Sequence, residues 1–75
     1  MSIDYAALLT DEQKRKILEQ RIAQFATEAY QHTLNKQTCE VLNDEEGIGF
    51  VDKALVTLEA AITTHQAELA ALPAE

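Results

Sequence analysis

The sequence predicts an all-α protein: an antiparallel helical hairpin of two long helices, preceded by a short N-terminal helical segment, that self-associates into a helical bundle. Three observations support this prediction. The apolar residues are mostly Ala, Leu, Ile and Val, and only two Gly and one Pro occur among 75 residues, a composition typical of helical bundles. Two apolar runs repeat with helical spacing. A polar stretch that favours a turn separates them.

The stronger repeat lies in the C-terminal half. Its members recur at alternating spacings of about four and three residues: Val51, Leu55, Leu58, Ile62, His65, Leu69 and Leu72. This is an unbroken heptad seam, the coiled-coil pattern that buries one stripe of a helix against a partner helix. We expect the second long helix at residues 50–72, because Pro73 disfavours helical backbone in the residue before it. Residues 73–75 are the expected tail.

A matching repeat lies upstream. It comprises Leu18, Ile22, Phe25, Ala29 and His32. Thr10 is the expected N-cap of this helix, because its hydroxyl can accept a hydrogen bond from the backbone N–H of Gln13 while the Gln13 side chain reaches back to Thr10. Cys39 stays in register with the seam, so we expect the first helix to occupy residues 10–42.

Residues 1–9 are expected to form a short amphipathic turn or helix that lies across the open end of the bundle. Ser2 or Asp4 can cap it. Its apolar face comprises Tyr5, Leu8 and Leu9. An arm that grips a neighbouring subunit is the alternative interpretation. The whole chain, residues 1–75, is expected to be one domain.

Residues 43–49 are the expected turn between the helices. Asn43 can end the first helix in the left-handed conformation, and Asp44 can cap the second. The two glycines of this stretch each weaken a helix by roughly 1 kcal/mol relative to Ala. We therefore expect the second helix to begin properly only at Phe50.

Folding the chain back at about residue 45 pairs residues whose numbers add up to about 90. Phe25 then meets His65, and Ala29 meets Ile62. On a helical wheel the apolar arc of the first helix covers about half of its circumference, which is more than one antiparallel partner covers. The surplus strip comprises Ala23, Ala26, Tyr30 and Leu34.

Self-association is the expected route to stability. A chain of this size has a core that supplies only about 3–5 kcal/mol, and it usually needs disulfides, a metal or a partner subunit. Cys39 is the only cysteine, so no intrachain disulfide can form. We predict a homo-oligomer, a dimer or larger. The predicted interface residues are Ala23, Ala26, Tyr30, Leu34 and Phe50.

The negative charge is concentrated in the C-terminal half. Acidic and basic side chains balance over residues 1–37, so the whole net charge of −7 comes from residue 38 onward. Binding to nucleic acids and to anionic lipids depends on clustered cations, so this charge argues against both. The short basic run at residues 14–16 is interpreted as a solvated helix face with i,i+4 ion pairs rather than as an RNA contact.

An acidic cluster surrounds the predicted turn. It comprises Glu40, Asp44, Glu45, Glu46 and Asp52. One interpretation is that the cluster imitates nucleic acid and occupies the groove of a nucleic-acid-binding protein. The simpler interpretation is that these charges provide solubility and cap the helices.

The sequence indicates neither a catalytic site nor a metal site. His32, His65 and Cys39 are the candidate metal ligands, but in the hairpin register His32 lies about two helical turns from each of the others. They do not converge as tetrahedral zinc requires. The carboxylates lie on exposed faces, and a two-helix bundle offers no cleft in which to perturb a pKa. We therefore predict a non-enzymatic protein without metal or cofactor, and a pH-sensitive assembly through the histidines stays an open alternative.

The run Thr10–Gln24, with the sequence TDEQKRKILEQRIAQ, resembles segments of small helical proteins that tailed bacteriophages encode. This resemblance implies a phage accessory or virion-associated protein. We therefore expect a self-associating helical interaction protein that binds a protein partner in a phage or bacterial assembly. Two alternatives stay open. One is an acidic phage inhibitor of a host nuclease or immune effector, and the other is an oligomer that sequesters a small ligand such as a nucleotide.

The sequence also carries expectations about cellular location. No run of about 18 apolar residues occurs, so we expect no membrane-spanning segment. Residues 1–9 contain Asp4 and no basic side chain, which argues against a secretory signal peptide. A lone cysteine fits a reducing compartment. We expect a cytoplasmic protein, in the host cytoplasm or the virion if a phage encodes it.

Overall fold

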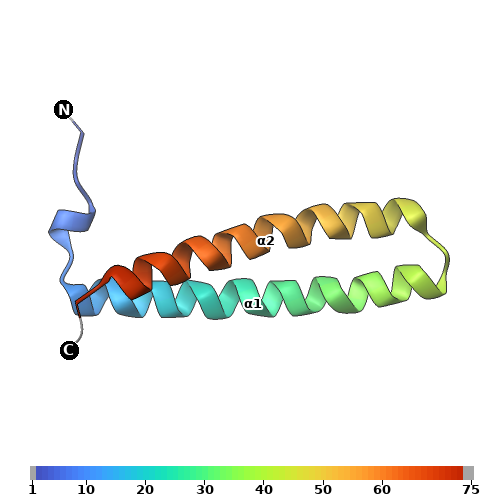
Figure 1. Ribbon diagram of the computed structural model, residues 1–75, viewed down its shortest axis with the longest axis horizontal. Helices are drawn as coiled ribbons and strands as arrows, with labels where there is room; N and C mark the ends of the chain where they lie inside the picture. The colour runs from blue at the N-terminus through green and yellow to red at the C-terminus, as the bar shows by residue number, and fades with distance from the viewer. Residues whose placement is uncertain (1, 74–75) are drawn as a thin grey trace.

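The computed structural model describes residues 2–73 and shows a hairpin of two long antiparallel helices (Figure 1). The elements in chain order are the 3-10 helix η1 (Ala6–Leu8), α1 (Asp11–Val41) and α2 (Glu45–Ala71). No strand occurs in this described part of the chain. The turn lies at one end of the hairpin and both termini lie at the other, open end. This arrangement confirms the all-α helical hairpin that the sequence predicts.

The first long helix, α1, begins with the predicted capping box. The Thr10 hydroxyl accepts a hydrogen bond from the backbone N–H of Gln13 at 3.1 Å. The Gln13 side-chain oxygen accepts one from the backbone N–H of Thr10 at 2.9 Å. These reciprocal bonds satisfy two donors that the helix itself leaves without partners. The helix then continues to Val41, next to its expected end at residue 42.

The turn between the helices is a Schellman motif. The backbone N–H of Asn43 donates to the carbonyl of Glu40 at 3.2 Å, and that of Asp44 donates to the carbonyl of Cys39 at 2.9 Å. Both bonds satisfy carbonyls at the end of α1. Asn43 has a φ of 56°, which is the left-handed conformation that the sequence predicts for it.

The second helix begins earlier than expected, at Glu45 rather than at Phe50. Asp44 Oδ1 accepts a hydrogen bond from the backbone N–H of Gly47 at 3.0 Å, and two glutamates occupy the first turn. The cap is worth about 1 kcal/mol and the charges near the helix N-terminus somewhat less. Together they offset much of the roughly 1 kcal/mol cost of each glycine. The expected turn is therefore confirmed at residues 43 and 44, and its continuation through residues 45–49 was wrong.

Gly47 allows the start of α2 to lie close to the end of α1. A Cβ atom at this position would lie 2.5 Å from Asp44 Oδ2 and 2.8 Å from Cys39 Sγ. A Cβ atom at Gly49 would meet nothing within 4 Å. Close packing therefore requires the first glycine, whereas the second has no packing role within the hairpin.

The helices pack in the predicted register. The rings of Phe25 and His65 lie edge to face with centroids 5.0 Å apart. Nearer the turn, Lys36 Nζ lies 2.7 Å from Asp52 Oδ1. Only Val51 and Leu58 are buried among the hydrophobic residues of the described chain. The remaining seam positions are half-buried, because a pair of helices shields each seam from one side only.

The N-terminal segment leaves the open end of the hairpin and projects away from it (Figure 1). Ala6 and Leu9 face the hairpin and line a small pocket there. Ile3, Tyr5 and Leu8 are exposed. Of the three residues expected to form the apolar face of this segment, only Leu9 lies against the helices.

Candidate functional site

The outer face of α1 carries the predicted apolar strip. We call this the α1 strip; it comprises Ala23, Ala26, Tyr30 and Leu34. Helix α2 packs against the opposite seam of α1, so all four residues stay exposed. Tyr30 is 66% exposed and Leu34 is 43% exposed. The structure therefore brings these four residues together on one solvent-facing surface, as the helical spacing predicts.

Val41, which is not among the interface residues that the sequence predicts, extends the α1 strip toward the turn. Its side chain is 82% exposed. The signal was available, because Val41 follows Leu34 by two helical turns and so shares its face. The strip thus covers more than half of the length of α1, from Ala23 to Val41.

Phe50, the fifth predicted interface residue, does not join the α1 strip. It lies on α2 close to the turn and is 73% exposed. In the observed register it lies level with the end of α1, where Leu42 is also exposed. Wheel positions place both side chains on the opposite flank from Tyr30. Phe50 and Leu42 therefore form a separate apolar patch at the tip of the hairpin.

The exposed apolar surface is large for so small a chain. Eleven large hydrophobic residues of the described chain are exposed, against two that are buried. Single exposed apolar side chains are normal in soluble proteins, but contiguous ones mark interaction surfaces. The α1 strip is contiguous along one helix face. It is therefore the candidate functional site.

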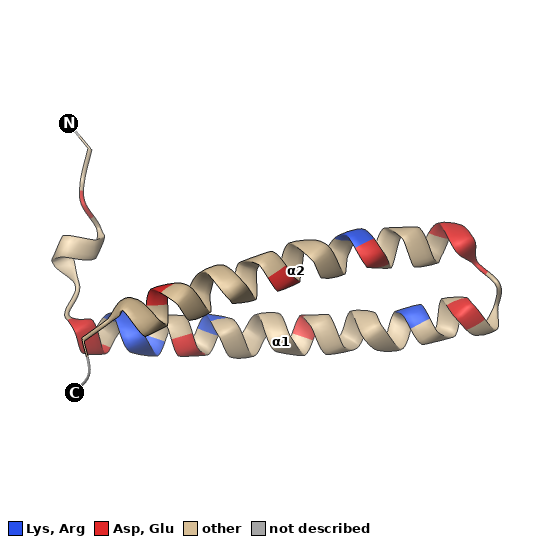
Figure 2. Cartoon of the chain, in the orientation of Figure 1, with Lys and Arg blue, Asp and Glu red and all other residues tan. Residues whose placement is uncertain are grey.

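The acidic cluster surrounds the turn, as Figure 2 shows. Asp52 forms a hydrogen-bonded ion pair with Lys36 of the other helix. The hydrogen bond and the charge attraction of Asp52 raise the pKa of Lys36. Asp44 is engaged as the cap of α2 through Gly47. The remaining cluster members, which are exposed, are Glu40, Glu45 and Glu46. Two of the five predicted acidic residues therefore have structural partners.

The two histidines lie at the helix interface. His65 Nε2 accepts a hydrogen bond from Arg21 Nε at 2.9 Å, and its Nδ1 lies 2.6 Å from the carbonyl oxygen of Ala61, to which it donates. The Arg21 guanidinium also lies over the Phe25 ring, 5.1 Å from its centroid. His32 Nδ1 is buried without a hydrogen-bond partner. No group of three metal-ligating side chains converges within residues 2–73.

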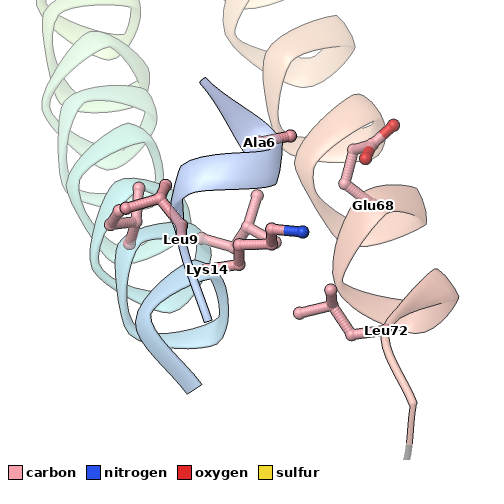
Figure 3. Close-up of a pocket in the computed structure, with 7 residues that line it drawn as sticks. Ala6, Leu9, Lys14, Glu68 and Leu72 are labelled. Atoms are coloured by element: carbon pink, nitrogen blue, oxygen red, sulfur yellow. The ribbon is translucent and has the colours of Figure 1, made fainter. Parts of the chain in front are cut away.

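A small apolar pocket lies at the open end of the hairpin, between η1, the start of α1 and the end of α2 (Figure 3). Its volume is about 200 Å³. The residues that line it are Ala6, Leu9, Lys14, Ile17, Leu18, Glu68 and Leu72. Sites for drug-sized ligands occupy about 300–1,000 Å³, so this pocket is small for a nucleotide. Sequence reasoning missed it because three separate segments form it.

Comparison with known proteins adds no relative. The chain matches no family profile, no curated protein and no solved structure. None of the helices in the described residues has the length and apolarity needed to cross a bilayer.

Proposed function

We propose that this protein is a non-enzymatic interaction protein that self-associates through the α1 strip. The observation that carries this proposal is the imbalance between two buried and eleven exposed large hydrophobic residues in the described chain. A hairpin with so little enclosed apolar surface gains stability by covering its strip with another helix. Tyr30 and Leu34 lie at the centre of the strip and are its principal contact residues.

We further propose that the assembled protein serves as an accessory or structural component in a phage or a bacterium, where it binds another protein. The resemblance of residues 10–24 to segments of small phage-encoded helical proteins supports this role. The corresponding location is the host cell cytoplasm or the virion. Short helical hairpins suit such a role because their length and outer faces can be matched to a neighbour without any cleft or cofactor.

Sedimentation of the purified chain at micromolar concentration tests self-association. The wild-type protein is expected to sediment as a dimer or larger species, and Leu34→Glu is expected to weaken the assembly by at least about tenfold in Kd. Roughly half of the Leu34 side chain remains to be buried in each copy, so two copies lose about 1.5 kcal/mol before the cost of burying a carboxylate is added.

Asn35→Glu is the matched control. It introduces the same charge on the same helix, one position away and outside the α1 strip. This variant should sediment like the wild type. A wild-type chain that stays monomeric and folded at micromolar concentration would contradict the proposal, and so would equal weakening by both variants.

The hairpin tip supports a second candidate, an acidic inhibitor of a nucleic-acid-binding protein. Three exposed glutamates lie there beside the exposed Phe50 and Leu42. A basic groove with an apolar floor would complement this tip. Binding to such a protein should be lost with Glu45→Gln and Glu46→Gln combined and should weaken as salt rises. Binding that survives both changes would remove this candidate.

A further inference from the structure

We infer that the occupant of the α1 strip is a second copy of this chain, and that the two hairpins pair antiparallel about a two-fold axis. The open end of each hairpin then lies beside the acidic tip of the other. This inference rests on the proposed self-association and adds the relative orientation of the two copies. Isologous two-fold pairing is also the commonest way in which identical chains associate.

Charge is the first observation that sets the orientation. Residues 40–52, at the tip, carry five acidic side chains and no basic one. At the open end, residues 11–21 carry four basic and three acidic side chains, and Glu68 at the end of α2 adds a fourth acidic one, so the charges there balance. Figure 2 shows red segments around the turn, whereas blue and red segments alternate at the start of α1. Parallel pairing would oppose one acidic tip to another, whereas antiparallel pairing places each tip beside cations.

Side-chain size is the second observation. When two copies of α1 run antiparallel with the stretch from Ala23 to Leu34 centred on the two-fold axis, residues whose numbers add up to about 57 face each other. Ala23 of one copy then faces Leu34 of the other, and Thr27 faces Tyr30. Each pair joins a small side chain to a large exposed one, and the two-fold axis produces each pair twice. Alternation of small and large residues is what close packing of two helices requires.

The same register aligns further groups along the bundle. Lys16 of one copy lies level with Val41 and Glu40 of the other. Lys16 is exposed, and within its own chain it pairs only loosely with Glu12, at 3.5 Å. Its ammonium group can therefore reach the acidic tip of a second copy. The exposed apolar residues of the N-terminal segment come to the same end of the assembly as Leu42 of the partner hairpin.

Charge reversal at the paired positions tests the orientation by sedimentation equilibrium. Lys16→Glu and Glu40→Lys should each raise the dimer Kd by roughly five- to thirty-fold, because each disturbs two symmetric exposed ion pairs worth about 0.5–1 kcal/mol each. The double variant should recover most of the loss. Glu40→Lys lowers the net negative charge, which by itself favours association, so weakening by this variant reports a specific contact.

Matched controls separate local from overall charge effects. Lys53→Glu changes the net charge as Lys16→Glu does, and Glu59→Lys changes it as Glu40→Lys does, but both controls lie on α2 away from the strip. They should leave the Kd within about twofold of the wild-type value. Equal effects of the test and control variants, or a double variant no better than the singles, would overturn the inference.

Chemical cross-linking distinguishes antiparallel from parallel pairing of the two copies directly. In a Cys39→Ser background, Glu19→Cys and Gln37→Cys lie on the flank of the strip, and their numbers add up to about 57. In the antiparallel dimer each faces the other across the interface, whereas two copies of the same position lie about 25–28 Å apart along the axis. A short bismaleimide should therefore join the two variants only when they are mixed.

The outcomes distinguish this inference from the proposed function. Cross-linking of each variant with itself, with none gained on mixing, would establish parallel pairing; self-association would stand and the orientation would fall. A third outcome is that Leu34→Glu dissociates the wild-type dimer, but neither the separate cysteine variants nor their mixture cross-links. This would show that another protein surface covers the flank of the strip, and it would also overturn the inference. A monomeric wild type would overturn both.

Discussion

Gly47→Ala and Gly49→Ala should change the free energy of unfolding in opposite directions. This contrast tests whether Gly47 is needed for close packing at the turn. Both residues lie in the first turns of α2. Helix propensity alone favours alanine at each position by roughly 1 kcal/mol. Only Gly47 has neighbours that oppose the added methyl group: Asp44 Oδ2 at 2.5 Å and Cys39 Sγ at 2.8 Å.

The magnitude follows from what must move. The Asp44 carboxylate holds the cap of α2 through its 3.0 Å hydrogen bond from Gly47, so displacing it forfeits about 1 kcal/mol. Displacing the Cys39 side chain within the packed turn adds roughly 1–2 kcal/mol. After the gain in propensity, Gly47→Ala should destabilise the protein by about 1–2 kcal/mol. Gly49→Ala should stabilise it by up to about 1 kcal/mol.

Urea denaturation followed by circular dichroism measures both variants, at one protein concentration because association contributes to stability. The midpoints should move in opposite directions, with unchanged slopes. Combining Gly47→Ala with Cys39→Ala should recover part of the loss, because one of the two close neighbours is removed. Equal stabilisation by both alanine substitutions would refute the packing argument and would show that Gly47 has no role beyond its low helix propensity.

Two further predictions concern the core and the ion pair near the turn. Leu58→Ala, at a buried seam position, should destabilise the protein by about 2–5 kcal/mol in the same assay, whereas Val56→Ala, at a 67% exposed position on α2, should change stability by no more than about 0.5 kcal/mol. Asp52 raises the pKa of Lys36 above its ordinary value of 10.5, so the contribution of this pair is present below that pH and is lost as pH rises through the folded-state pKa. NMR titration of the Lys36 side chain should show this raised pKa, and Asp52→Asn should return it toward the ordinary value; an unchanged titration would mean that the pair does not persist in solution.

Sequence reasoning predicted the helices well because local chemistry sets their ends. The capping box at Thr10, the left-handed Asn43 and the helix-ending effect of Pro73 all depend on neighbouring residues alone. The register was also predictable, since two heptad seams of similar length can be matched in few ways. The contact between Phe25 and His65 follows from that match.

The start of α2 and the make-up of the candidate site depended on contacts between distant residues. From the sequence, Gly47 is expected only to weaken the helix, because its close approach to Cys39 arises only when the two helices meet. The sequence predicts Phe50 as an interface residue together with the α1 strip, but the hairpin places it on another flank, at the tip. The pocket at the open end brings together Leu9, Ile17 and Leu72 from three segments, a grouping that periodicity does not encode.

The chain's own pattern thus determined two amphipathic helices, their caps and an apolar arc on α1 that is wider than one partner covers. Local hydrogen bonding and helical periodicity act over a few residues, so a sequence can display them directly. The tertiary structure decided which part of that arc α2 covers, leaving Tyr30 and Leu34 exposed, and it placed the acidic tip at the opposite end of the hairpin from the start of α1. Those outcomes depend on how two helices lie against each other, and only their packing in three dimensions specifies it.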